Sequence, residues 1–434
     1  MNAAQPVFTP RKLQPVGSFM TASDVAFSLK KAIEVGTSTK FSGYLNDVEV
    51  TGEYTVRMTL KNPVLGSIEY CLSQIPIVTQ AAFESQTDNE RATQPITTGP
   101  YRVEEFVSGS YITLVRNDNY WQTDDSLKSY QAAANAKKVT LKVTTENSQR
   151  SIALETGSAD IASSIAVSDL GQFMAEDGSS KAGYTVEPVL SGTTVVLEFN
   201  CSTDSVFNNK ALRQAALYAI DTPSIMQAEV GVRGLSTKSF ASQAVSDYDP
   251  AWNDEDYYDY DPAKAAEKLA ESGVDMNGKV VKIMCQSEHS TACQVIQAFL
   301  MQIGIQSQIV AYDSALFNTN MYVSTEWDIM VNTYGFTDYT IDGWSLRLNR
   351  NGFASGSNGQ FVNDDHLQEL VEAASSLDTH SQETVNAVHE YVAENAFCVG
   401  LYTPYQYIVA NDSVSKIVHH PWGQVIAGSC EFVK

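Results

Sequence analysis

Long apolar runs are missing from this sequence of 434 residues. No stretch approaches the roughly 18 consecutive apolar residues that a membrane helix needs, and the longest runs, such as 193–199, have the length of a strand. The sequence therefore excludes a membrane-spanning helix. A chain of this length is also too long for one compact core, which predicts about two or three domains.

Basic residues are scarce. The chain has 28 Lys and Arg against 51 Asp and Glu, which gives a formal net charge of −23. A nucleic-acid binder gains affinity by neutralising phosphates with basic side chains, and an acidic chain is repelled by anionic membrane surfaces. The composition argues against a nucleic-acid partner and favours plain solubility.

The usual signatures of metal and catalytic sites are incomplete. The six cysteines stand singly, so no C-x-x-C pair indicates a zinc or redox site, and the sequence does not pair them. His389 and Glu390 begin a zinc-protease motif, but Ala393 occupies the place of its second histidine. His419 and His420 are adjacent, and neighbours on a strand point to opposite faces. We expect no cofactor, no metal site and no enzymatic activity.

Two other motifs favour structure over binding. Segment 273–279 nearly spells a phosphate-binding loop, but Val280 stands where the magnesium-holding hydroxyl belongs, and the helix precedes the loop instead of following it. We interpret it as the turn that ends a helix. The acidic residues between 247 and 261 lack the glycine and terminal glutamate of a calcium loop, so we interpret that segment as a solvated loop.

Helical and strand patterns alternate along the chain. A T-x-x-D capping box at Thr21 opens the first helix, and Asp261 caps a helix that Gly273 ends. This order favours an α/β fold with a parallel or mixed sheet, and a boundary near 190–193 separates two α/β regions. A cleft between such regions is a favoured place for small ligands. Helices are expected at about 22–35, 148–156, 208–220, 262–272, 290–302, 364–376 and 382–395, and strands at about 47–51, 54–60, 101–106, 111–116, 138–144, 159–162, 193–199, 279–284, 305–311, 327–332 and 398–409.

Segment 334–344 (YGFTDYTIDGW) has the composition of a binding loop. It follows an apolar strand and places two acids among four aromatic residues, with no basic residue before Arg347. A carboxylate in an aromatic pocket suits an ammonium group, because charge pairing and cation–π attraction act together. The alternative is a structural loop whose aromatics belong to the core and whose acids cap the next turn.

Several segments, in order along the chain, resemble one family. They are FMTASDVAFSL (19–29), YTVRMTLKNP (54–63), PITTGPYRV (95–103), LVRNDNYW (114–121), RSIALETGSADIA (150–162), FNCSTDSVFNNKALRQAALYAID (199–221) and YDPAKAAEKLAESG (260–273). Together they resemble the extracytoplasmic solute-binding proteins of family 5, which serve peptide and nickel ABC importers. Thr97 replaces a glycine that is usual in the third segment.

The resemblance implies a periplasmic-binding-protein-like fold of type II, in which two α/β lobes joined by crossover strands close like a clamshell. The family also carries a further N-terminal stretch with an export or lipoprotein signal, so we expect this chain to be N-terminally truncated. The implied divisions are 1–86 as a remnant of an extra subdomain on lobe I, 87–190 as lobe I, 191–409 as lobe II, and 410–434 as the return to lobe I.

The resemblance also assigns a binding site. In peptide-binding members, a lobe II loop of the pattern G-W-x-x-D-Y/N supplies an aspartate that pairs with the α-ammonium of the peptide. Asp338 stands at that place, although Gly335 lies one position late and Phe336 replaces a small or polar residue. Asp338 is the expected anchor. The other expected ligand-binding residues are Tyr334, Phe336, Tyr339 and Trp344 as pocket walls, with Arg347 or Arg350 for a carboxylate.

The implied function is the substrate-binding component of an ABC importer. Such a protein binds short peptides, delivers them to permease subunits in the membrane, and acts as a monomer outside the cytoplasm, in the periplasm or held as a lipoprotein. One alternative is a nickel-chelate, sugar or other small-solute binding protein of the same importer class. Another is a hydrolase with Asp338 and Asp342 as a carboxylate pair, which no accompanying nucleophile, base or metal signature supports.

Overall fold

The computed structural model describes residues 20–36, 43–61, 65–255, 257–323, 325–335, 348, 362–420 and 423–433. The chain divides into two compact units. Unit 1 comprises Met1–Asn62, Ile68–Val189 and Gln406–Lys434, and unit 2 comprises Pro63–Ser67 and Leu190–Tyr405. The lobe boundaries implied by the family resemblance stay a prediction.

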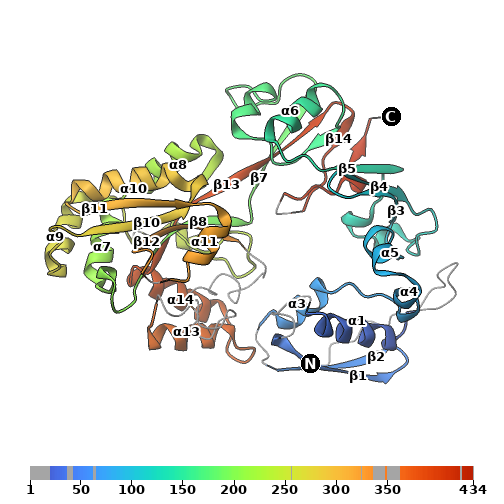
Figure 1. Cartoon of the computed structure of the whole chain (residues 1–434), viewed down its shortest axis with the longest axis horizontal. Coiled ribbons are helices and arrows are strands. Elements are labelled where there is room, and N and C mark those ends of the chain that lie inside the picture. The colour runs from blue at the N-terminus through green and yellow to red at the C-terminus, as the bar shows by residue number, and fades with distance from the viewer. Residues whose placement is uncertain are drawn as a thin grey trace. The chain divides into compact units, whose positions relative to one another are not determined.

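Unit 2 is built on a mixed sheet (Figure 1). Its strands are β8 (Thr193–Phe199), β9 (Gly234–Ser236), β10 (Val280–Gln286), β11 (Gln306–Tyr312), β12 (Ile329–Gly335) and β13 (Cys398–Asn411). The order is β11-β10-β12-β8-β13, with β9 paired to β13. Strand β10 is parallel to β11 and β12, whereas β8 is antiparallel to β12 and β13.

Strand β8 lies between β12 and β13, and every residue after Thr193 is buried. A strand that is covered on both faces has no reason to alternate apolar and polar residues. After its two threonines, the sequence TTVVLEF is accordingly apolar except for Glu198. The apolar run predicted this strand with its observed bounds.

Helices pack around the sheet of unit 2 (Figure 1). They are α7 (Lys210–Ala219), α8 (Thr222–Glu229), α9 (Pro262–Ser272), α10 (Ser290–Gln302), α11 (Ser314–Asn320), α13 (Asp365–Ser375) and α14 (Gln382–Glu394). Helix α10 buries Ala292, Cys293, Ile296 and Leu300, which recur at the spacing of one helix face. Gly273 takes a left-handed conformation with φ 65° at the end of α9. The interpretation of 273–279 as a helix-ending turn is therefore confirmed.

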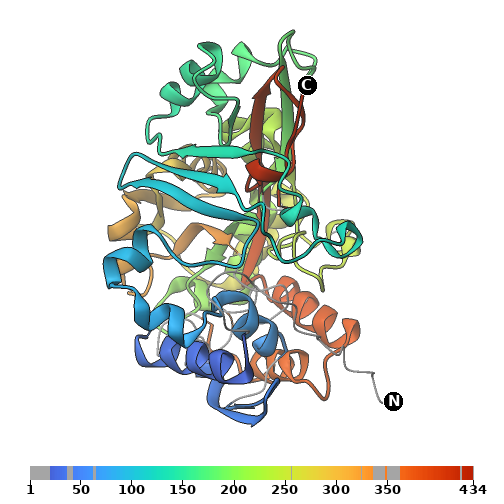
Figure 2. The ribbon, with the colours of Figure 1, turned by 90° about the vertical axis from the view of Figure 1, so that its right-hand side faces the viewer.

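Unit 1 contains smaller sheets. The elements that lie wholly or mainly in it are α1 (Ala22–Glu34), β1 (Leu45–Gly52), β2 (Thr55–Leu60), α3 (Ser67–Gln74), α4 (Gln80–Ser85), α5 (Asp88–Thr93), β3 (Tyr101–Val107), β4 (Tyr111–Arg116), β5 (Lys138–Lys142), α6 (Asn147–Glu155), β6 (Ile161–Ala162), β7 (Tyr184–Leu190), β14 (Val414–Lys416) and β15 (Glu431–Phe432). Strands β1 and β2 pair as a hairpin, and β3, β4 and β5 form an antiparallel sheet. The final part of β13 pairs with β6 and β7, and Figure 2 shows it beside β7.

The first helix begins as the sequence predicts. The backbone N–H of Thr21 donates to Asp24 Oδ2 at 2.8 Å, which is one half of the capping box. Helix α1 then buries Leu29 against Leu45 and Val48 of β1, and these apolar residues form a small core of their own.

Two expectations need correction. The strand expected at 327–332 begins two residues later and ends three residues later, since β12 is Ile329–Gly335. Trp327 lies before the strand, is buried in an apolar cluster, and donates its indole N–H to the Met321 carbonyl. The acidic segment 247–261 is only partly solvated, since Asp247 and Trp252 in it are buried. No helix in the described ranges is long and apolar enough to cross a membrane.

Candidate functional site

The expected binding loop follows strand β12. Tyr334, the next-to-last residue of β12, is described by the structure. The other expected site residues lie outside the described residues, namely Phe336, Asp338, Tyr339, Asp342, Trp344, Arg347 and Arg350. The roles given to them stay predictions. The structure describes strand β12, which precedes this loop.

Tyr334 is fixed in the core of unit 2. Its side chain is buried in the main apolar cluster, and its hydroxyl donates to Glu198 Oε2 at 2.8 Å. The side-chain amide of Asn332 donates to Glu198 Oε1 at 3.4 Å. The buried carboxylate of Glu198 therefore accepts hydrogen bonds from two side chains on the same face of β12. The pocket-wall role of Tyr334 stays a prediction.

A second polar cluster, the Glu229 network, lies on the other face of β12. Glu229, the last residue of α8, accepts from the Tyr402 hydroxyl at 2.9 Å and from the Ala292 backbone N–H at 2.7 Å. Its Oε1 lies 2.7 Å from His289 Nδ1, and His289 Nε2 lies 2.8 Å from the Thr333 hydroxyl. The network joins α8, α10, β12 and β13 at the carboxyl ends of β10 and β12.

In the Glu229 network, a carboxylate of the protein itself occupies the N-terminus of α10. The N-terminus of a helix attracts anions, because its backbone N–H groups and dipole face outward there. In α10 that place is taken by the carboxylate of Glu229. Burial, and then the charge of Glu229, raise the pKa of Tyr402, so its hydroxyl stays protonated and continues to donate. A ligand carboxylate would have to be bound elsewhere.

Sequence reasoning did not find this network. Its members stand at 229, 289, 333 and 402, and no local pattern links positions so far apart. The signal for Glu198 was present, since one acid interrupts an otherwise apolar strand. A charge that is buried in a central strand requires partners, and those partners lie on the neighbouring strand.

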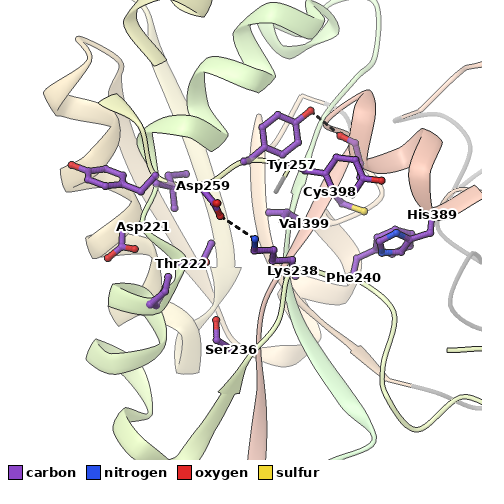
Figure 3. A pocket seen from close by; sticks show the side chains of 16 residues that line it. Asp221, Thr222, Ser236, Lys238, Phe240, Tyr257, Asp259, His389, Cys398 and Val399 are labelled. Atoms are coloured by element: carbon purple, nitrogen blue, oxygen red, sulfur yellow. Dashed lines mark hydrogen bonds and ion pairs between the residues drawn. The ribbon is translucent and has the colours of Figure 1, made fainter. Parts of the chain in front are cut away.

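A separate cavity of about 160 Å³ lies in unit 2 near the junction of α7 and α8 (Figure 3). On one side Lys238 Nζ lies 3.0 Å from Asp259 Oδ1 and donates to the Glu255 carbonyl at 2.9 Å. On another side are Phe240 and His389, whose rings stack. The cavity is smaller than the roughly 300–1,000 Å³ typical of ligand pockets. Tyr334 does not line it, and its lysine is already paired, so it does not resemble a peptide site.

The described residues contain no group of three or more His, Cys, Asp or Glu side chains that could hold a metal ion. His389, which the sequence left as half of a zinc motif, is buried between aromatic rings and within reach of the Ser239 hydroxyl. It is a core residue of unit 2.

Comparison with known proteins gives a consistent result. Residues 17–355 match the family described as bacterial extracellular solute-binding proteins, family 5 Middle. The glutathione-binding protein GsiB of Pectobacterium atrosepticum is 24% identical over 310 residues, which cover 69% of this chain and 55% of GsiB. The chain thus spans about half the length of the curated relatives it matches.

Solved structures share the fold. An ABC transporter substrate-binding protein from Listeria monocytogenes superposes with a TM-score of 0.80 at 20% identity, over 96% of this chain and 85% of that one. A dipeptide-binding protein from Pseudoalteromonas sp. SM9913, in complex with Met-Leu, gives 0.70 at 18% identity, over 98% and 86%. The expected α/β, periplasmic-binding-protein-like fold is therefore confirmed.

Proposed function

Because this chain belongs to the bacterial extracellular solute-binding proteins of family 5, we propose that it is the substrate-binding component of an ABC importer. It binds a short peptide and delivers it to permease subunits in the membrane. The observation that carries the proposal is the family match over residues 17–355. The peptide class is supported by the names of similar proteins, one a glutathione-binding protein and one a dipeptide-binding protein in complex with Met-Leu.

The proposed anchor is Asp338. It follows β12, and β12 is held on one face by Glu198 and on the other by the contact of Thr333 with His289. A loop that leaves a fixed strand end can present a carboxylate at a reproducible place, which lowers the ordering cost of binding. If Asp338 pairs with a peptide ammonium in a desolvated site, loss of this pair should weaken peptide binding by about 3 kcal/mol.

The remaining proposals concern the setting. The protein acts as a monomer outside the cytoplasm, in the periplasm or anchored as a lipoprotein, and performs no catalysis. The description of the matching family as extracellular supports the location outside the cytoplasm.

Ligand-dependent thermal unfolding tests the function. Wild-type protein is heated with di- to pentapeptides, reduced glutathione, N-acetylated peptides and a nickel–histidine chelate. A ligand at roughly 100 times its dissociation constant should stabilise the fold by about 2.7 kcal/mol. We expect stabilisation by peptides with a free amine and none by the acetylated peptides. Stabilisation by the nickel chelate alone would replace the peptide proposal with the nickel alternative.

Two variants test the anchor. Asp338→Ala should lose the peptide-dependent shift, whereas Asp342→Ala, an acid of the same loop, should keep it. Both proteins should unfold at the wild-type temperature in the absence of peptide. If the Asp338→Ala protein is stabilised as strongly as wild type, the anchor is assigned to the wrong residue while the peptide function stands.

A further inference from the structure

Another cavity, of about 300 Å³, lies within unit 1. Helices α1, α4 and α5, which Figure 1 labels, contribute residues to it, together with the segments that join α3 to α4 and α5 to β3. Its volume reaches the lower limit of about 300 Å³ for ligand pockets, whereas the cavity in unit 2 does not. The candidate loop after β12 belongs to unit 2, so the proposed peptide function does not account for this cavity.

The walls of this cavity are mainly apolar. The rings of Phe27 on α1 and Phe83 on α4 meet edge to face, with centroids 5.4 Å apart. Two further lining residues remain open to solvent, since Val35 is 63% exposed and Ile96 is 44% exposed. Apolar surface that is gathered in a hollow and still in contact with water favours a ligand with an apolar body.

The charges of the lining are all of one sign. Among the described residues that line the cavity, Lys31 and Arg91 are basic and none is acidic. In the whole chain acids outnumber bases by 51 to 28, so this lining has the opposite sign from the protein as a whole. A ligand that carries a negative charge is therefore favoured here over one that carries a positive charge.

Arg91 is held in position by the backbone. Its guanidinium donates to two backbone carbonyls, that of Phe83 at 2.6 Å among them, and lies 4.1 Å from the centroid of the Phe83 ring. A cation that is already positioned loses little freedom when it binds an anion. Its partner Asp88 is 99% exposed, and Glu34, the partner of Lys31, is 68% exposed. Because such exposed pairs contribute little to stability, a bound anion can replace them.

We propose that this cavity binds a free monocarboxylate with an apolar body of the size of octanoate. A cavity of about 300 Å³ has room for about ten groups of the size of a water molecule, whose share of liquid volume is about 30 Å³. About ten non-hydrogen atoms therefore fill it, which is the size of octanoate. The hydrocarbon chain packs against Phe27 and Phe83, and the carboxylate accepts hydrogen bonds from Arg91 and Lys31. This site is a second one, beyond the proposed peptide function.

Isothermal titration calorimetry of the whole chain tests the ligand class. The protein is titrated with octanoate, with 1-octanol and with octylammonium, which share one apolar body and differ in the charge of the head group. Octanoate should bind at a single site, and 1-octanol should bind about tenfold more weakly because it lacks the charge. Octylammonium should bind most weakly. No binding of octanoate, equal binding of octanoate and 1-octanol, or tighter binding of octylammonium would overturn the proposal.

Matched pairs of variants test the place of the site. Lys31→Gln should weaken octanoate binding about threefold, whereas Lys30→Gln, the neighbouring lysine that does not line the cavity, should leave it unchanged. Ala82→Phe should fill the cavity and abolish binding, whereas Ala81→Phe, at an exposed position of α4, should retain it. Asp338→Ala should bind octanoate as wild type does.

Three results would contradict this place. They are equal octanoate binding by the two lysine variants, wild-type binding by Ala82→Phe, and loss of binding by Asp338→Ala. The last result would put octanoate at the proposed peptide anchor. The lysine pair decides the matter alone if Ala82→Phe does not fold.

Discussion

The imidazole of His389 lies flat against the indole of Trp252, with ring centroids 4.2 Å apart and 2° between the ring planes. Phe240 is parallel to the same imidazole at 5.2 Å. Burial lowers the pKa of His389 to about 3, although the charge of Asp249 opposes this effect. His389 therefore stays neutral where an exposed histidine would be charged, and it should make the fold sensitive to acid.

The first prediction concerns pH. The pKa of a histidine in an unfolded chain is about 6.5, so below that pH the unfolded chain binds a proton that native His389 does not. Stability should fall as the pH drops from 6.5 toward 3, by up to about 1.4 kcal/mol per pH unit. Urea unfolding between pH 7 and 5 measures this slope. His389→Gln should reduce this slope. His366→Gln should leave the slope unchanged, because the side chain of His366 is 59% exposed. Equal slopes in wild type and His389→Gln would contradict the assignment.

The second prediction concerns Arg213, which is buried in unit 2. Its guanidinium donates to the Asn395 carbonyl from Nε at 3.1 Å and from Nη2 at 2.8 Å, and to the Phe207 carbonyl at 2.6 Å. Arg213→Met should lower the free energy of unfolding by about 3 kcal/mol, because buried carbonyl groups lose their donor. Arg57→Met, which removes an exposed ion pair with Glu49, should cost less than about 1 kcal/mol. Chemical denaturation measures both, and similar costs would refute the prediction.

The third prediction concerns Gly400 of β13. A Cβ atom at this position would lie 2.0 Å from the Ser239 carbonyl oxygen, and a backbone atom has little freedom to move away. Gly400→Ala should destabilise unit 2 by about 1–3 kcal/mol through overpacking. Gly171→Ala is the matched control, since a Cβ there meets no atom within 4 Å. Thermal unfolding compares the two, and a harmless Gly400→Ala would mean that the strand shifts easily.

The fourth prediction concerns the Glu229 network. Glu229→Ala leaves His289, the Tyr402 hydroxyl and the Ala292 N–H without their acceptor, which should cost about 3 kcal/mol or more. Glu229→Gln keeps an acceptor oxygen and should cost less. Glu288→Ala removes a neighbouring acid that is 68% exposed and should change little. Unfolding in guanidinium chloride ranks the three, and a Glu229→Ala protein as stable as the Glu288→Ala protein would refute the role of the network.

The sequence predicted elements whose signals are local. Helix α10 begins and ends at the expected residues because its apolar face recurs at helical spacing, and β8 was recognisable as an apolar run. Helix α8 and strand β9 were not expected. The first is short and weakly patterned, and the second has three residues and exists through its pairing with β13.

The position of the candidate site stays a prediction from the sequence, and the contacts that support strand β12 beside it were not predictable. The composition of 334–344 indicated a binding loop after β12, and its carrying residue, Asp338, lies outside the described residues. The contacts of Glu198 and Glu229 depend on strands and helices that meet only in the folded chain. Long-range pairing of this kind leaves no trace in local periodicity.

The position of β13 in the sequence determines when folding can be completed during synthesis. Strand β8 needs β13 as a neighbour, and unit 1 includes the chain from Gln406 onward. Neither unit can complete its native contacts while the ribosome is still short of these residues. The nascent chain therefore stays incompletely folded until β13 has been synthesised, a state in which holding chaperones can still act on it.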